Sequence, residues 1–331
     1  MTKKTVGILI GDASGVGPEI VAEVAAKGDL TADVNPVIIG DVRQFEQGLK
    51  VVNKECEHYV IDDSFEIDYN RGIPVYDLGD QDPEKVVMGK AQPYCGSGDI
   101  SQIKAACRLA REGKIAGFCY APLHKGAMRS AGMEVESEAE LMAKEFGAPG
   151  PIGEVNMIGS LMTFRVTSHI PLKDVSAHLN VDNIFETIRL GWKTSRTFGV
   201  AEPRIAVAGL NPHNGEGGKC GTEEIEVIQP AIDRARKAGM DVIGPISGDI
   251  VFMRAFKGEF DVVITMFHDQ GQIALKVMGF DQGVTIGGGL PYPITTAAHG
   301  TAFGRAGKGY ASTTAFENAV SVLSRMVSDK E

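Results

Sequence analysis

The sequence predicts an α/β fold, and three observations support this prediction. Short apolar runs of the buried-strand type alternate with longer segments of helical periodicity, which is typical of βαβ units and mostly parallel sheets. The 41 glycines gather at the ends of the apolar runs, where tight turns between strands and helices are expected. The chain has 331 residues, 43% of them hydrophobic, which is enough for a large core and, by length, for about two domains.

The elements can be assigned in order along the chain. A strand at residues 6–10 leads into a turn at residues 11–17, and Pro18 then lies where a helix can begin. We expect further strands at residues 35–39, 117–120, 164–168, 205–210, 242–243 and 262–267. We expect helices at residues 19–26, 101–112, 137–146, 181–193, 223–238 and 311–327.

No internal repeat and no low-complexity linker marks a domain boundary. We place a first domain at residues 1–130 plus about 300–331, because we expect the last helix to return to the first half of the chain. The second domain then covers about residues 131–299.

Composition argues against several classes of function. The net charge of -10 does not suit a surface that neutralises nucleic-acid phosphates. No apolar run reaches the roughly 18–20 residues that span a bilayer, and the N-terminus has no signal-peptide pattern. The five cysteines form no CxxC pair, so we expect reduced and mostly buried thiols. These features predict a cytoplasmic protein without nucleic-acid or membrane partners.

Three histidines directly follow predicted strands, namely His169, His213 and His268. In parallel α/β sheets, ligands bind beyond the carboxyl ends of the strands. Three imidazoles delivered to that edge can converge on one divalent metal and leave a coordination position open for a substrate. A single histidine is more often a packing or surface residue, but the three together favour a metal site.

Two acidic residues and one lysine are the catalytic candidates. Asp269 adjoins His268, and Asp249 follows the brief strand at residues 242–243. Each carboxylate is a candidate ligand or a partner that orients a metal-bound imidazole. The alternative for Asp249 is a helix N-cap. Lys276 can bind an anionic substrate group, and its alternative is a solvated surface charge.

Two glycine-rich segments are candidates for ligand binding. The turn at residues 11–19 lacks the third glycine of the dinucleotide fingerprint and the Gly-Lys-Ser/Thr of a P-loop. We therefore interpret it as a tight turn, and the alternative puts Asp12 at the mouth of a cleft. Gly287, Gly288 and Gly289 precede Leu290 inside an apolar stretch, where glycines let a ligand approach the backbone. We assign these four residues to cofactor binding, and the alternative is a simple loop.

Four segments, taken in order, resemble the 4-hydroxythreonine-4-phosphate dehydrogenase family, and the match spans almost the whole chain. They are Gly11-Asp12 with Gly15 and Gly17-Pro18-Glu19-Ile20, then Leu210-Asn211-Pro212-His213 with Gly215-Glu216-Gly217-Gly218, then His268-Asp269-Gln270-Gly271, and finally His299-Gly300-Thr301-Ala302.

The resemblance implies two α/β/α domains with a cleft between them, similar to the isocitrate and isopropylmalate dehydrogenases, and a homodimer with shared active sites. It implies a divalent metal (Zn, Mg, Mn or Co) held by His169, His213 and His268. It also implies oxidation of a secondary alcohol by NAD or NADP to a β-keto acid, which then loses carbon dioxide. A metal lowers the pKa of a chelated hydroxyl and stabilises an enolate, and the nicotinamide carries out the redox step.

The chain departs from the family at the substrate-binding positions. The family's His-Thr pair falls on Glu138 and Ala139, its Asn on Thr285 and its Arg on Ile294, so that only Lys276 is kept. Loss of an arginine removes a bidentate phosphate clamp. Glu138 adds repulsion to a phosphate unless it pairs with a cation such as Lys276. We therefore expect a substrate that is not anchored by a phosphate.

The sequence thus predicts a metal-dependent, NAD(P)-linked dehydrogenase of a small hydroxy acid, which oxidises a secondary alcohol β to the carboxylate, with decarboxylation. The alternatives are the vitamin B6 biosynthetic 4-hydroxythreonine-4-phosphate dehydrogenase itself, a cis-dihydrodiol carboxylate dehydrogenase, and a catalytically inactive binding homologue. A metal-dependent hydrolase is disfavoured, because it would not need the glycines at residues 287–289.

Overall fold

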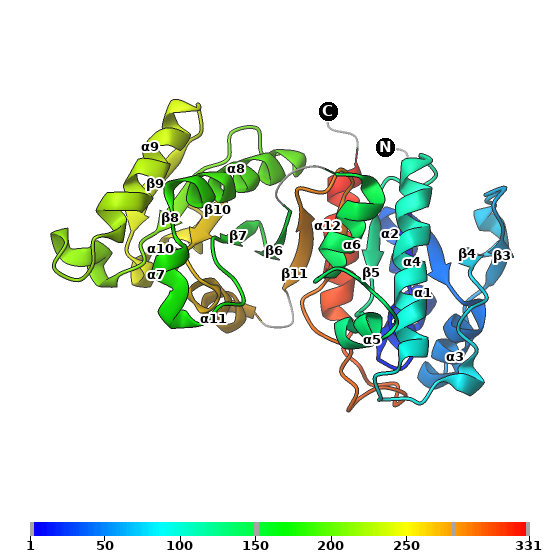
Figure 1. Ribbon diagram of the computed structural model, residues 1–331. Coiled ribbons are helices and arrows are strands. Elements are labelled where there is room, and N and C mark those ends of the chain that lie inside the picture. The colour runs from blue at the N-terminus through cyan, green and yellow to red at the C-terminus, as the bar shows by residue number, and fades with distance from the viewer. Residues whose placement is uncertain (1–2, 149–151, 280–282, 329–331) are drawn as a thin grey trace. The chain divides into compact units, whose positions relative to one another are not determined.

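The computed structural model describes residues 3–148, 152–279 and 283–328, and the chain divides into two compact units (Figure 1). Unit 1 consists of Met1–Pro149 and Val284–Glu331, and unit 2 of Gly150–Gly283. Each unit contains mostly parallel strands with helices packed on them, which confirms the predicted α/β class.

The strands of unit 1 follow the order β3-β4-β2-β1-β5-β12-β11. Paired neighbours run parallel, except that β11 is antiparallel to β12. The strands are β1 (Thr5–Leu9), β2 (Asn35–Gly40), β3 (His58–Ile61), β4 (Ile73–Asp77), β5 (Phe118–Tyr120), β11 (Val284–Gly288) and β12 (Ile294–Ala297). The helices are α1 (Gly17–Lys27), α2 (Leu30–Asp33), α3 (Val42–Val52), α4 (Pro93–Arg111), α5 (Lys125–Ser130), α6 (Glu138–Phe146) and α12 (Thr314–Val327).

The strands of unit 2 follow the order β6-β7-β10-β8-β9, and only β6 is antiparallel to its neighbour β7. They are β6 (Gly153–Ile158), β7 (Leu161–Arg165), β8 (Ile205–Ala208), β9 (Val242–Ile246) and β10 (Val262–Thr265). The helices are α7 (Val175–His178), α8 (Val181–Thr197), α9 (Gln229–Lys237), α10 (Gly248–Ala255) and α11 (His268–Gly279). A π-turn at Glu224–Ile228 leads into α9.

Each unit has its own hydrophobic core. In unit 1, strand residues such as Leu9, Ile39 and Phe118 are fully buried against Ile103 and Leu109 of α4. The apolar runs of the parallel strands are buried on both faces, which explains why they read as continuous hydrophobic stretches. In unit 2, a smaller core joins α10 to the strands β7, β8 and β10.

The boundaries of the units differ from the predicted domains, which had placed residues 131–149 and 284–299 in the second domain. The first of these segments carries α6, whose Leu141 and Met142 are buried in the same core as Ile103 of α4. The second carries β12, which pairs with β5. Both therefore belong to unit 1, and so does the segment at residues 287–290 that we assigned to the cofactor.

Some elements escaped prediction. The strands β3 and β4 and the helix α3 were not expected, and residues 284–288 form a strand rather than a loop. Among the described residues, we find no helix with the length and apolar character needed to cross a membrane.

Candidate functional site

The three candidate histidines follow three neighbouring parallel strands of unit 2. Strand β10 pairs with β7 on one side and with β8 on the other. His169 lies just beyond β7, His213 beyond β8, and His268 beyond β10, where it begins α11. Because these strands are parallel, their carboxyl ends meet at one edge of the sheet, which is the usual place for a ligand.

His169 and His268 lie close together. Their ring centroids are 5.6 Å apart, with the ring planes inclined by 45°. This separation follows from the pairing of β7 with β10, in which Arg165 lies opposite Thr265. Two imidazoles at this spacing can both face one small ligand.

His213 occupies an unusual turn at Pro212–Gly217. His213, Asn214, Gly215 and Glu216 are four successive residues with left-handed backbone angles, and the φ of His213 is 50°. A left-handed conformation costs a non-glycine residue roughly 1–2 kcal/mol, so other contacts must hold this turn. The side chain of His213 is 70% exposed.

Two of the three histidines have a carboxylate partner at Nδ1. The Nδ1 of His213 lies 3.0 Å from Glu216 Oε1, and the Nδ1 of His268 lies 2.7 Å from Asp269 Oδ1. A carboxylate only accepts, so Nδ1 is the donor and Nε2 presents its lone pair. This is the tautomer that a metal-binding imidazole needs. The hydrogen bond to Glu216 also raises the pKa of His213.

These donors fit a divalent metal by chemistry, although one chain does not assemble a complete set. In residues 3–148, 152–279 and 283–328, no three His, Cys, Asp or Glu side chains form a group that could hold a metal. His169 and His268 are brought together, whereas His213 does not join them in such a group. The predicted metal site therefore stays a proposal.

The loops that carry the histidines are tied together by Gln270. Its Oε1 accepts a hydrogen bond from the backbone N–H of Met266, and its Nε2 donates to the carbonyl of Gly209. The amide thereby links the end of β10, from which His268 follows, to the segment that precedes His213.

Asp249 and Lys276 occupy exposed positions in unit 2. Asp249 lies in the first turn of α10 and accepts a hydrogen bond from Ser247 Oγ at 2.6 Å. Ser247 rather than Asp249 is the N-cap residue, so the alternative interpretation of Asp249 was wrong. Asp249 is one of the charges that raise the pKa of His213, which places it near that imidazole. Lys276 lies exposed in the last turn of α11.

The substrate-binding candidates other than Lys276 lie in unit 1. The buried carboxylate of Glu138 pairs with the ammonium group of Lys125 at 3.2 Å, where we had considered Lys276 as its partner. Ala139 follows in α6 and is half-buried. Glu138 thus does not present an uncompensated charge.

Two other candidates belong to the β11–β12 hairpin. Thr285 is half-buried and lies opposite Thr296, whereas Ile294 is 1% exposed and packs in the core of unit 1. A side chain so enclosed cannot contact a substrate in this structure, because its apolar surface is already buried against its neighbours.

The predicted cofactor segment lies in the same hairpin. A Cβ added at Gly287 would lie 2.7 Å from Leu290 Cδ1, so this glycine makes room for the side chain of Leu290. Gly288 is buried, and Gly289 follows with a φ of 80°. The absence of a side chain at residue 287 is explained by packing, and no contact here tests the cofactor assignment.

The carboxyl edge of the sheet of unit 1 holds two buried acids, of which only Asp12 was considered from the sequence. Asp12 and Asp99 are both fully buried, and each has one carboxylate oxygen without a hydrogen-bond partner among the described residues. Burial raises the pKa of Asp99 well above its ordinary value, and the charges of Asp12 and Glu138 add to this effect. Burial likewise raises the pKa of Asp12. Because Asp12 is fully buried, this structure does not place it at the mouth of a cleft.

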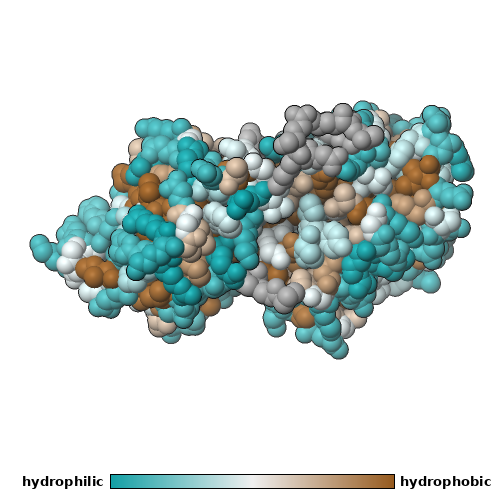
Figure 2. All heavy atoms as spheres, turned by 90° about the horizontal axis from the view of Figure 1, so that it is seen from above, coloured by the Kyte–Doolittle hydropathy of each residue, from teal (hydrophilic) through white to brown (hydrophobic). Residues whose placement is uncertain are grey.

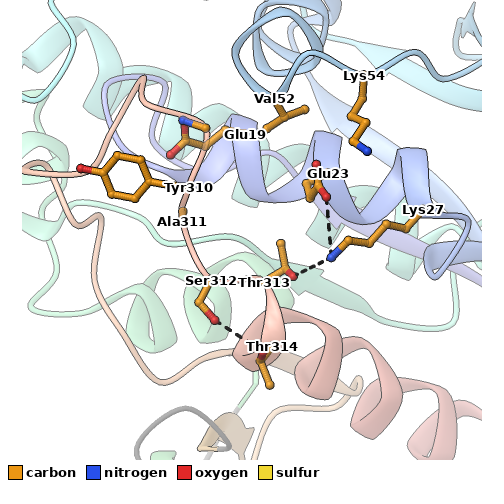
Figure 3. A pocket seen from close by; sticks show the side chains of 11 residues that line it. Glu19, Glu23, Lys27, Val52, Lys54, Tyr310, Ala311, Ser312, Thr313 and Thr314 are labelled. Carbon is orange, nitrogen blue, oxygen red and sulfur yellow. Dashed lines mark hydrogen bonds and ion pairs between the residues drawn. The ribbon is translucent and has the colours of Figure 1, made fainter.

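A separate cavity of about 400 Å³ runs along α1 in unit 1 (Figure 3). In Figure 3 the ammonium group of Lys27 points toward Glu23 and Thr313, with Thr313 Oγ1 at 3.1 Å. None of the residues that we assigned to the metal, the cofactor or the substrate lines this cavity, although Glu19 at the end of the glycine-rich turn does.

Comparison with known proteins identifies the family. The family model described as pyridoxal phosphate biosynthetic protein PdxA matches residues 32–323. The chain belongs to the PdxA family. This match covers both units and includes all three strand-end histidines.

Curated PdxA-family relatives are dehydrogenases. The chain is 40% identical to putative 4-hydroxythreonine-4-phosphate dehydrogenase 2 of Rhizobium meliloti, over 99% of this chain and 94% of the relative. It is 39% identical to D-threonate 4-phosphate dehydrogenase of Cupriavidus necator, over 92% of each chain. The structure resembles the crystal structure of 4-hydroxythreonine-4-phosphate dehydrogenase from Klebsiella pneumoniae with a TM-score of 0.89, 34% identity and 99% coverage of both chains. These relatives support an oxidoreductase of the dehydrogenase type.

Several site residues of this PdxA-family chain escaped the sequence analysis. Glu216 and Gln270 lie within the matching segments, but only the folded turn shows that they contact His213 and bridge the two loops. Lys125 lies in α5, and no sequence pattern linked it to Glu138. Nothing in the sequence marked Glu224 as a site residue, and we noted only that it lies in a predicted helix.

Proposed function

We propose that this chain is a metal-dependent, NAD(P)-linked dehydrogenase that oxidises a secondary alcohol β to a carboxylate, with decarboxylation of the resulting keto acid. One observation carries the proposal. Three histidines follow three adjacent parallel strands, and two of them have a carboxylate at Nδ1 that leaves Nε2 available. The dehydrogenase names of the relatives supply the reaction type.

A bound divalent metal would supply Lewis-acid chemistry that lowers the pKa of the substrate hydroxyl, and NAD or NADP would accept the hydride. The roles that we assign to the chain are to bind and orient. His169, His213 and His268 would hold the metal through Nε2. Asp269 keeps the imidazole of His268 in the required tautomer, as Glu216 does for His213.

The substrate that we propose is a four-carbon 3-hydroxy acid. Both compounds in the names of the relatives have a carboxylate, a hydroxyl at C3 and a phosphate at C4, and they differ in the amine or hydroxyl at C2. Oxidation at C3 places a ketone β to the carboxylate, which is the arrangement that loses carbon dioxide readily. Both compounds can therefore undergo the proposed oxidation at C3 followed by decarboxylation.

The Glu138–Lys125 pair bears on the phosphate group. The expectation of a substrate without a phosphate anchor rested on the replaced positions Glu138, Ala139, Thr285 and Ile294, and the repulsion from the Glu138 carboxylate was one part of it. Lys125 compensates that charge at 3.2 Å, so the repulsion is largely removed. We therefore propose that the substrate carries a phosphate, as in the relatives, and a substrate without phosphate becomes the alternative.

A homodimer is part of the proposal. Ile250 and Met253 of α10 lie one turn apart and are 42% and 59% exposed. Ile273 and Val277 of α11 are also one turn apart and are 62% and 80% exposed. Figure 2 shows apolar residues among hydrophilic ones on the surface of unit 2, at the left. Exposed apolar side chains in such number suit a protein–protein contact, and a second copy is the partner that we propose.

The substrate assignment can be tested by following reduction of NAD and NADP together with release of carbon dioxide. D-Threonate 4-phosphate, 4-phosphohydroxythreonine and unphosphorylated D-threonate should be compared at matched concentrations. We expect one of the two phosphorylated acids to give a kcat/KM of roughly 10⁴ M⁻¹s⁻¹ or more. Efficient turnover of D-threonate alone would refute the phosphorylated substrate, and no reduction with any hydroxy acid would favour the inactive homologue.

A further inference from the structure

The turn that carries His213 is built around a buried carboxylate. Glu224, 3% exposed, lies at the start of the π-turn that leads into α9. Its Oε1 accepts hydrogen bonds from the backbone N–H groups of Leu210 and Asn211, both at 2.7 Å. Its Oε2 accepts a third hydrogen bond from Asn211 Nδ2 at 2.9 Å. One side chain therefore fixes the two residues that lead into Pro212 and His213.

Two glycines lie against this carboxylate in a crowded turn. A Cβ at Gly209 would lie 2.3 Å from Asn214 Oδ1 and 3.1 Å from Glu224 Oε1, and a Cβ at Gly215 would lie 2.5 Å from the carbonyl oxygen of Gly221 and 3.0 Å from Glu224 Oε2. These glycines come before and after His213, so the turn folds around Glu224 from both sides. Gly215 also has a positive φ of 74°, which a glycine adopts without steric cost.

The turn needs such an anchor because of its backbone. His213, Asn214 and Glu216 are non-glycine residues in the left-handed region, which L-residues adopt only when surrounding contacts hold them there. Asn214 Nδ2 donates to the carbonyl of Pro245, which holds the middle of the turn. Glu224 is the residue that holds its beginning.

We propose that Glu224 is a positioning residue that sets the direction of the His213 imidazole. This inference rests on the proposed role of His213 as a metal ligand. If the two backbone N–H groups lose their common acceptor, residues 210–211 are free to move and the left-handed turn relaxes. The Nε2 of His213 then leaves the direction that the metal requires.

The test uses the full-length protein and Co²⁺, whose visible absorption reports its ligands. Metal-free wild type, Glu224→Ala and Glu224→Gln should be titrated with Co²⁺. Glu226→Gln is the matched control, because Glu226 is an exposed carboxylate in the same π-turn. Amide hydrogen exchange at Leu210 and Asn211 should be measured on the same samples.

We expect Glu224→Ala to bind Co²⁺ at least tenfold more weakly, with an altered absorption spectrum and faster exchange at Leu210 and Asn211. Glu226→Gln should match wild type in all three readouts. If Glu224→Ala does not fold, Glu224→Gln is the deciding variant. We expect it to bind Co²⁺ at least threefold more weakly, because the amide group of the new glutamine would face the amide of Asn211.

The outcomes separate the inference from the proposed function. Wild-type Co²⁺ affinity and spectrum in a folded Glu224 variant would overturn the positioning role and leave the metal site standing. Failure of the wild-type protein to bind Co²⁺, or equal affinity in His213→Ala, would overturn both. A merely structural role for Glu224 would lower thermal stability without changing the Co²⁺ spectrum of the folded protein.

Discussion

The Lys125–Glu138 ion pair gives a prediction whose size can be worked from the structure. Lys125→Met removes the cation and keeps much of the side-chain length. The carboxylate of Glu138, with a side chain only 9% exposed, then loses its cation at 3.2 Å in a region that already holds buried Asp99. Breaking a buried ion pair from one side costs roughly 3–5 kcal/mol.

This figure must be reduced for solvent, because the side chain of Lys125 is 42% exposed. We expect a loss of about 1–3 kcal/mol in the free energy of unfolding. For a unit of this size, 1 kcal/mol shifts the melting temperature by about 2–4 °C. Lys125→Met should therefore lower the melting temperature by about 2–12 °C in a calorimetric scan.

The chain offers a matched control for this experiment. Lys144 and Glu134 form an ion pair of similar length, 3.0 Å, but their side chains are 60% and 80% exposed. Lys144→Met should change stability by no more than about 0.5 kcal/mol. The double substitution Lys125→Met with Glu138→Gln should recover most of the loss, because the unpaired carboxylate of Glu138 is then gone. Equal losses in Lys125→Met and Lys144→Met, or no recovery in the double variant, would refute the reasoning.

Three further predictions concern other residues. Burial raises the pKa of Asp99 well above its ordinary value of 3.8, so the fold loses stability as pH rises above 3.8, the loss is complete above the raised pKa, and it vanishes as pH falls back. Asp99→Asn should therefore raise the melting temperature near about pH 8, and this gain should shrink toward about pH 4; a constant gain would contradict the titration. Asp269→Ala should weaken metal affinity about 10–100-fold by removing the acceptor for Nδ1 of His268, and unchanged affinity in calorimetric titration would exclude that role. The double variant with Met253→Lys and Ile273→Lys should sediment with the mass of one chain, whereas the wild type should sediment with the mass of two. A wild-type sedimentation profile would place the dimer contact elsewhere.

The sequence predicted the part of the site that depends on strand ends. Residues 205–208 and 262–265 form short strands that are buried on both faces, and a continuous apolar run followed by a histidine is visible in the sequence. That β10 lies between β7 and β8 could not be predicted in this way, because strand order depends on how the intervening helices pack.

The partners of the site residues were harder to predict. Asp269 was found because it adjoins His268 in sequence. Glu216 was not, because only a left-handed turn brings its carboxylate back to Nδ1 of His213. Lys125 and Glu138 come from different helices, and no local pattern predicts a contact between α5 and α6.

The hairpin of β11 and β12 was anticipated only in part. The segment with three successive glycines was not expected to contain a strand, yet Thr285 and Ile286 pair with β12. A side chain at residue 287 would force Leu290 to move, because Leu290 Cδ1 occupies the space that a Cβ would approach to 2.7 Å. Glycine content alone does not distinguish a ligand-binding loop from a packed strand, because in both cases another group approaches the backbone closely.

The central claim is that the strand-end histidines hold a metal that oxidation requires. The most direct measurement is NAD(P) reduction with the best hydroxy acid, after a chelator and then after a divalent metal is added back. We expect the chelator to abolish turnover and added metal to restore it in wild type but not in His213→Ala. Full turnover by the chelated wild-type protein, or by metal-free His213→Ala, would contradict it.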